Sequence, residues 1–147
     1  MVYQIKRRKR RTQELELVDE NGLIQRKIVV ELDTDTMMKR VMEAYRDLCS
    51  AQRLFQNAGA EDRADPEQLE RLGLAVTGLI KAVFGQEDAQ AILAFYEDRS
   101  IEMCTEIIPF IIDRIIPELR HAAQEDRRAV KDYYRRNSGR KNHMTKR

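Results

Sequence analysis

The residues best suited to chemistry in this chain are two histidines and two cysteines, and their surroundings match no catalytic pattern. General acid–base catalysis needs a group that titrates near neutral pH, and His121 and His143 are the two histidines of the chain. His121 lies near an expected helix end, where it would interact with the helix dipole, and His143 lies in an expected tail. Cys49 and Cys104 lack the spacing of metal ligands, and we interpret them as buried, reduced thiols rather than a disulfide.

Acidic and glycine residues likewise occur where helix structure alone explains them. Three acidic pairs stand at expected helix starts, where capping and the helix dipole favour carboxylates without any metal: Asp33 with Asp35, Asp62 with Asp65, and Glu87 with Asp88. The glycines at 73, 78 and 85 lie inside or at the end of a helical pattern and match no phosphate-binding loop. We therefore expect no enzyme activity, no catalytic residue, no metal site and no cofactor.

The segment 101–119, IEMCTEIIPFIIDRIIPEL, is the most apolar stretch of the chain. Charged residues interrupt it throughout, so it lacks the roughly 20 apolar residues that a membrane-spanning helix needs. At helical spacing its isoleucines share one face, whereas Pro109 and Pro117 fall on the opposite, polar face. A residue before proline avoids the α region, so the pattern allows a break at Ile108 or Ile116, or one continuous curved helix.

This apolar face has two interpretations. It is either the core of a small helical body or a surface wide enough to leave a groove for a partner segment, in the helix-in-groove manner. For the second interpretation we predict the following contact residues: Ile107, Ile108, Phe110, Ile111 and Ile115.

Charge is strongly segregated along the chain. Residues 1–11 carry six basic groups and no acidic one, and residues 124–147 carry nine basic and three acidic groups. The body between them, 12–123, holds 12 basic and 22 acidic residues. Basic clusters of this kind bind phosphates through counterion release, so both arms are candidate nucleic-acid contacts: Lys6, Arg7, Arg8, Lys9, Arg10, Arg11, Arg135 and Arg136. The arms would equally suit the acidic bodies of neighbouring copies, or serve only as solvated tails.

The order of patterns predicts a mainly α fold with an N-terminal β-hairpin, an α+β domain of about four helices. A basic arm (1–12) precedes a single domain (13–123), and a basic, mobile tail (124–147) follows it. Asn21-Gly22 between alternating residues predicts a hairpin over 13–32 with a type I′ turn, which needs positive φ at both central residues. Capping residues and apolar spacing predict helices over 36–57, 66–84, 86–97 and 100–123, with a polar loop over 57–65.

Several short phrases in this order resemble a known family. A hairpin is followed by a helix that opens on Asp33-Thr34-Asp35-Thr36, and then by the phrases 80–85 (IKAVFG), 91–97 (AILAFYE) and 107–111 (IIPFI). Over roughly residues 13–120 the chain is similar to the small tail assembly chaperones of siphophages and related prophages of Gram-positive bacteria. The basic cluster at Lys6–Arg11 is a departure from that pattern.

The resemblance implies a non-enzymatic role in the bacterial host cytoplasm. Such chaperones coat the tape measure protein, the long, largely helical and apolar ruler of the growing tail, and multimerise along it. They recruit tail tube protein, often through a longer form made by ribosomal frameshifting. The resemblance therefore implies a tape measure partner and a homo-oligomer, while nucleic acid bound to the basic arms is the alternative, and no membrane is expected.

Overall fold

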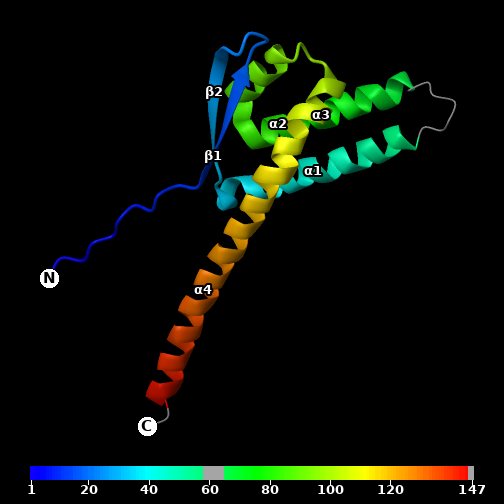
Figure 1. The fold of residues 1–147 in the computed structure, drawn as a ribbon. Coiled ribbons are helices and arrows are strands. Elements are labelled where there is room, and N and C mark those ends of the chain that lie inside the picture. Colours follow the sequence, from blue (N-terminus) through cyan, green and yellow to red (C-terminus); the bar gives the residue numbers. More distant parts are fainter. Residues whose placement is uncertain (58–64, 146–147) are drawn as a thin grey trace.

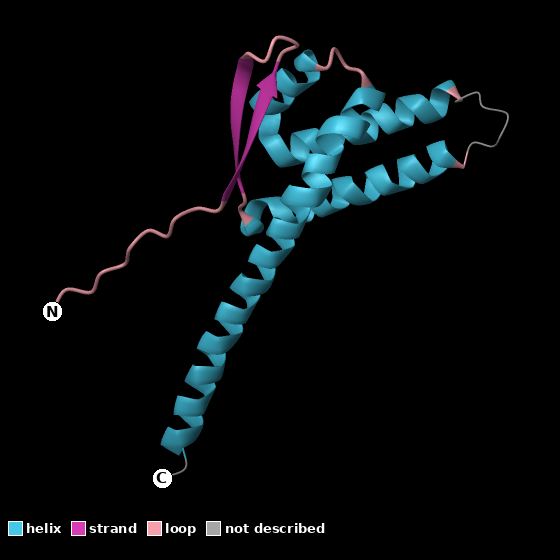
Figure 2. Cartoon of the chain, in the orientation of Figure 1, coloured by secondary structure: helices cyan, strands magenta, loops and turns pink. Residues whose placement is uncertain are grey.

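The computed structural model describes the backbone of residues 1–57 and 65–145, and side chains as far as residue 136. The fold is mostly helical with an N-terminal two-stranded antiparallel hairpin, which confirms the predicted class (Figures 1 and 2). Instead of about four separate helices, it forms two long helices and a third rod built from three helical segments. The elements in chain order are β1 (Thr12–Val18), β2 (Ile24–Glu31), α1 (Thr34–Gln56), α2 (Pro66–Phe95), α3 (Ser100–Phe110), η1 (Ile111–Ile115) and α4 (Ile116–Thr145).

The hairpin forms where its alternating pattern predicts it, but with a different turn. Leu15 pairs with Ile28 on the inner face, and Val18 pairs with Ile24 beside an irregularity of the register. Gly22 has φ +83°, whereas Asn21 keeps a negative φ, so the predicted type I′ turn is wrong. The carboxylate of Asp19 accounts for the difference, because it accepts hydrogen bonds from the N–H groups of Asn21 and Leu23, both at 2.9 Å, and so holds a longer loop.

Helices α1 and α2 start at the predicted capping residues and lie side by side (Figure 1). The side chain of Asp33 accepts from the N–H of Asp35, and that of Asp65 accepts from the N–H of Glu67. The polar loop predicted over 57–65 falls mainly on residues 58–64, outside the described residues.

The structure explains why glycine occurs at two positions of α2. Gly85 (φ +81°, ψ 173°) kinks α2 at the position where the sequence predicts that one helix stops and another begins. Gly73 permits a close approach, because a Cβ there would lie 2.8 Å from Oγ of Ser100 at the start of α3. Gly78 has no such neighbour within 4 Å, so close helix packing explains the first of the two mid-helix glycines and not the second.

The apolar segment forms one continuous helical rod, which decides between the two predicted alternatives. Pro109 lies inside α3, and Pro117 follows the π-helical turn η1, in which the N–H of Ile116 donates to the carbonyl of Ile111. In a regular α-helix the ring of Pro117 would collide with the carbonyl of Asp113, four residues earlier. We attribute the wider π turn to that collision.

The rod continues far beyond its predicted end. The sequence predicts an end near residue 123 and a mobile tail, whereas α4 is helical to Thr145 and projects away from the body (Figure 1). The apolar spacing fades there because no second element covers this part of the helix. Arginine, lysine and alanine nevertheless favour helix intrinsically, and Asp132 stands four residues from both Arg128 and Arg136, a spacing at which opposite charges stabilise a helix.

One hydrophobic core joins the hairpin to all three helical rods. The inner face of the hairpin covers one side of it, and the α3–η1–α4 rod crosses the α1–α2 pair on another (Figure 1). The largest fully buried side chains are Ile28, Val41, Leu48, Val76, Leu79, Ile80, Ile92, Met103, Ile108, Ile111, Ile115 and Leu119.

Candidate partner-binding surface

The contact residues predicted from the apolar segment lie in the core. Ile107 is 2% exposed, Ile108 1%, and Ile111 and Ile115 are completely buried. Phe110 is partly buried and packs against the same core. The prediction of an exposed contact set is thus corrected for the folded chain, because these side chains belong to one buried core together with residues of the hairpin, α1 and α2. Accessible apolar side chains lie elsewhere, among them those of Val130, Tyr133 and Tyr134 on α4.

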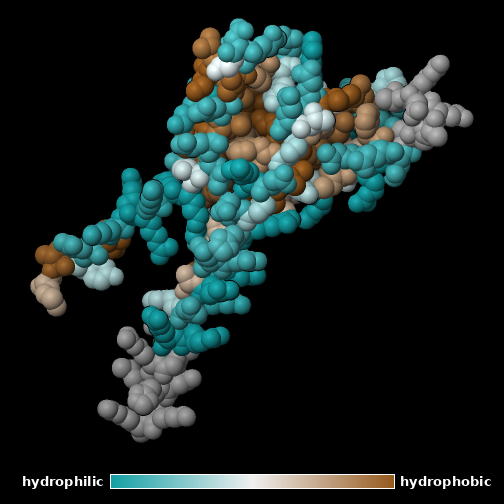
Figure 3. Space-filling model, in the orientation of Figure 1, coloured by the Kyte–Doolittle hydropathy of each residue, from teal (hydrophilic) through white to brown (hydrophobic). Residues whose placement is uncertain are grey.

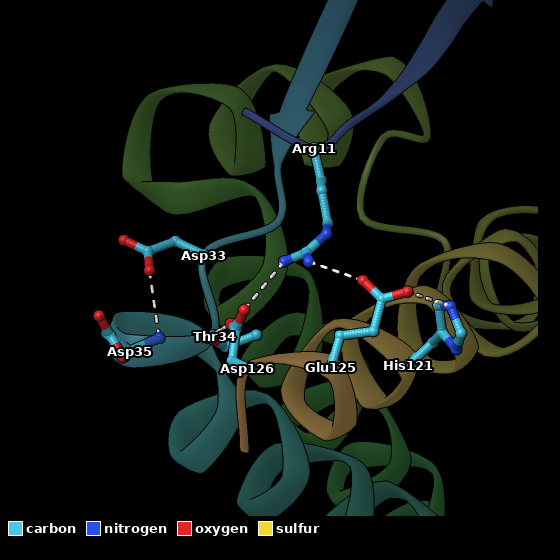
Figure 4. Close-up of polar contacts among 7 residues, drawn as sticks. All are labelled: Arg11, Asp33, Thr34, Asp35, His121, Glu125 and Asp126. Carbon is cyan, nitrogen blue, oxygen red and sulfur yellow. Dashed lines mark hydrogen bonds and ion pairs between the residues drawn. The ribbon is translucent and has the colours of Figure 1, made fainter. Parts of the chain in front are cut away.

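A polar network fixes the start of the projecting part of α4 to the hairpin and to α1 (Figure 4). Nη2 of Arg11, just before β1, donates to Oε2 of Glu125 at 2.9 Å, and its Nη1 lies 3.7 Å from Oδ1 of Asp126. Asp126 also accepts from the hydroxyl of Thr34, the first residue of α1, at 2.9 Å. His121 Nε2 lies 2.9 Å from the second oxygen of Glu125, one helical turn away.

This network orients α4 more than it stabilises the fold. The side chains of Arg11, Glu125 and Asp126 are 39%, 50% and 40% exposed, and exposed ion pairs contribute about 0–1 kcal/mol each. Three elements nevertheless converge on two adjacent carboxylates, and the carbonyl of Arg11 additionally accepts from the N–H of Leu32 at 2.8 Å. The direction in which α4 leaves the body is therefore defined. His121 pairs within α4 and is not at a helix end, which corrects the predicted dipole role.

An apolar groove runs beside this network, between the start of α1 and α4. Its volume is about 490 Å³. Met38 of α1 and Ala123 and Val130 of α4 supply its apolar lining, and the remaining lining is polar or charged: Thr34, Asp35, Asp126, Arg127 and Lys131. Val130 is 54% exposed, so the groove opens onto solvent at its outer end.

The apolar face of α4 continues outward from the groove without a covering element. Tyr133 and Tyr134 are 63% and 64% exposed, and their rings meet edge to face with centroids 5.7 Å apart. Val130 and Tyr134 stand four residues apart and so share one side of the helix. Together with the groove they form a stripe that we name the α4 stripe: Met38, Ala123, Val130, Tyr133 and Tyr134. None of them belongs to the contact set predicted from the sequence, because the fading apolar periodicity of this segment resembles that of an unstructured tail.

The two basic segments project from the same end of the body (Figure 1). Lys6 to Arg11 form an extended, exposed arm, and Arg135 and Arg136 lie on the exposed part of α4. The arm borders a hollow of about 470 Å³ that is also lined by acidic residues, including Glu31 and Asp126. Arg10 lies 3.5 Å from Glu31, and Arg11 pairs with α4. Part of the basic charge is thus neutralised within the chain.

The remaining reactive groups are scattered. Cys49 and Cys104 are both free thiols, and burial raises the pKa of Cys104. The neighbouring Cys49 thiol raises the pKa of Tyr45. Burial, with Glu106 and Glu102 nearby, raises the pKa of Tyr96 to about 12. In the described part of the chain, no three His, Cys, Asp or Glu side chains come together to hold a metal ion.

Among the helices that the structure describes, none is both long and apolar enough to cross a membrane. Comparison of the chain with protein-family models, with curated proteins and with solved structures found no match. Function therefore has to be inferred from the surface itself and from the resemblance noted in the sequence.

Proposed function

We propose that this protein is an assembly chaperone that binds an apolar helical segment of a partner along the α4 stripe. The observation that carries the proposal is the unpartnered apolar face of α4, which continues from a groove in the body to Tyr134. A helix laid along this face would cover Val130 and Tyr134 and enter the groove beside Met38.

The charge around the stripe suits a partner that is apolar but not strongly charged. The acidic side chains of Asp35 and Asp126 line the groove together with the basic side chains of Arg127 and Lys131. Mixed signs of this kind keep the rim of an interface hydrated, while its apolar centre supplies most of the affinity. Methionine suits a surface that accepts varied sequences, because its side chain adapts to different neighbours.

The identity of the partner comes from the sequence resemblance. A tape measure protein is a long, largely apolar helical chain, and a protein that coats it needs an accessible apolar surface and contacts between copies. The expectation of a non-enzymatic role in phage tail assembly belongs to this proposal, as does tail tube protein as a second partner through a longer form. The buried isoleucines of segment 107–115 then support the surface rather than forming it.

Co-expression tests the proposal with matched variants on one helix. The chain is co-expressed with the longest apolar, helical polypeptide encoded beside it, and the soluble complex is purified and sized. Val130→Asp places a charge in the groove, whereas Ala129→Asp places the same charge on an exposed neighbouring position that does not line it. We expect Val130→Asp to abolish co-purification and Ala129→Asp to retain it. Equal recovery of partner with both variants would refute the role of the stripe.

The alternative function, binding of nucleic acid, is favoured by one observation. The basic N-terminal arm and the basic part of α4 leave the same end of the body, so both can reach one phosphate backbone (Figure 1). Salt separates the two proposals: binding of labelled DNA or RNA should weaken steeply between low and moderate salt, whereas a complex through the α4 stripe should persist. Arg135→Glu with Arg136→Glu should reduce nucleic-acid binding and leave the apolar complex intact.

A further inference from the structure

Strand β1 has a free edge. Of the described strands, β2 is its single neighbour. The N–H of Leu32 donates to the carbonyl of Arg11, and this fixes which backbone groups of β1 point toward β2. In that register the N–H and carbonyl groups of Glu14 and Glu16 point away from β2, and no described backbone group bonds to them. An edge of this kind is a template for another strand.

A groove runs along this free edge. It has a volume of about 270 Å³ and lies between β1, the end of α2 and α3. Its apolar lining comes from Leu15 and Leu17 of β1, Phe95 and Tyr96, and Ile107. A strand added to β1 would therefore gain backbone hydrogen bonds at the edge and an apolar seat for every second side chain.

The rim of the groove is acidic. Glu16 and Glu106 both line it. Glu106 and Glu102 lie close enough to the hydroxyl of Tyr96 to contribute to its raised pKa. An incoming strand that carries positive charge beside its apolar residues is thus favoured over a neutral or acidic one.

The chain itself contains a segment with this composition. Val2, Tyr3 and Ile5 are between 86% and 88% exposed at the end of the N-terminal arm, and Lys6 begins the basic run. Figure 3 shows hydrophobic residues at the tip of the arm, separated from the body by hydrophilic ones. In an extended segment, Tyr3 and Ile5 point to one side, and Gln4 and Lys6 point to the other. Tyr3 and Ile5 would then face the groove while Lys6 lies beside the glutamates of β1.

The arm is directed away from the groove of its own chain. Arg10 pairs with Glu31 at the end of β2, and Arg11 pairs with Glu125 of α4. Residues 7–11 consequently run past the end of β2 and the start of α1, not along the free edge of β1. The tip projects into solvent on that side (Figure 1), where a second copy can receive it.

We propose that residues 2–6 of one copy add as a third strand to the free edge of β1 in a second copy. The arm and the edge are different surfaces, so the contact is head to tail, and repetition of it builds a ring or an open chain. The inference rests on the proposed function, in which copies multimerise along a partner, and it names the surfaces that join them. Purified protein without any partner tests it, so its failure is distinct from a failure to bind the partner.

Analytical ultracentrifugation of the purified full chain over a range of concentrations provides the test. Tyr3→Asp with Ile5→Asp removes the apolar tip. Glu16→Pro removes an N–H that points to the free edge, so it blocks strand addition without breaking the β1–β2 pairing. Lys27→Pro is the matched control, because Lys27 pairs opposite Glu16 and its N–H points away from β1.

We expect the wild-type chain and the Lys27→Pro variant to form species above the monomer mass, and each of the other two variants to remain monomeric. A mixture of those two should form dimers and nothing larger, because one has an intact edge and the other an intact arm. Wild-type protein that stays monomeric at about 1 mM would overturn the proposal. At that concentration even a contact with a dissociation constant of about 1 mM would produce a large associated fraction. Association that survives both variants, loss of association with Lys27→Pro, or a mixture without dimers would overturn it as well. Circular dichroism confirms that each variant folds.

Discussion

Replacement of Ile115 by alanine tests whether the apolar face of the third rod is core. Ile115 is completely buried in the π-helical turn, and truncation of a buried isoleucine to alanine costs about 2–5 kcal/mol. The turn lies between two prolines in a continuous rod, so the backbone has little freedom to collapse into the cavity, and we expect a loss of about 3–4 kcal/mol. For a chain of this size, that loss lowers the melting temperature by about 10 °C.

The control lies on the same rod. Ile101 is 56% exposed, and Ile101→Ala should change stability by less than about 0.5 kcal/mol, since little area is buried and alanine favours helix. Urea unfolding followed by circular dichroism at one pH and salt concentration gives both values with their slopes. Equal midpoints for the two variants would refute the assignment of Ile115 to the core. The result would then favour the original interpretation of this segment as a contact surface.

Three further perturbations check other parts of the structure. Gly85→Ala should destabilise by about 1–3 kcal/mol in urea unfolding, because φ +81° and ψ 173° are strained for any residue with a Cβ, although no atom lies within 4 Å to obstruct it. The raised pKa of Tyr96 favours the folded state below about pH 10, where the phenol is neutral in both states, and this contribution is lost as pH rises to about 12. Tyr96→Phe should therefore lose less stability than wild type over that interval, and a parallel pH profile of the two would contradict the shift. Arg11→Ala should cost less than about 2 kcal/mol, and the difference from wild type should shrink in 1 M salt, because the pairs are exposed.

Local sequence signals predict the first two-thirds of the fold well. The hairpin follows from alternation around Asn21-Gly22, and both long helices follow from carboxylate caps at Asp33 and Asp65. Gly85 marks the kink of α2 because no other residue type adopts its backbone angles cheaply. Each of these features depends on residues that are close together in the sequence, so local patterns are enough to predict it. The turn type is the exception, since the Asp19 carboxylate competes for the same backbone groups.

Features that depend on distant residues are harder to predict. The apolar stripe of 101–119 has the same width whether a partner or the chain itself covers it. Only the packing shows that the stripe lies in one core with residues of the hairpin, α1 and α2. The α4 stripe escapes prediction for the opposite reason: periodic apolar spacing reports packing within a chain, and Val130 and Tyr134 are 54% and 64% exposed in this one. A surface meant for another molecule leaves a weaker pattern than a core.

The projecting part of α4 links stability to binding. From Arg127 to Arg136 every side chain is exposed, and an isolated helix of about 15 residues or fewer is marginal in water even with favourable residues. The anchored turn at Glu125 and Asp126 removes the cost of nucleation, so the helix needs only propagation from a formed end. A partner that packs on Val130 and Tyr134 would then add favourable contacts to a helix that is already nucleated but only marginally stable on its own. Binding along α4 should therefore increase its helicity, and the Arg11 network, although worth little in stability, determines where that helix points.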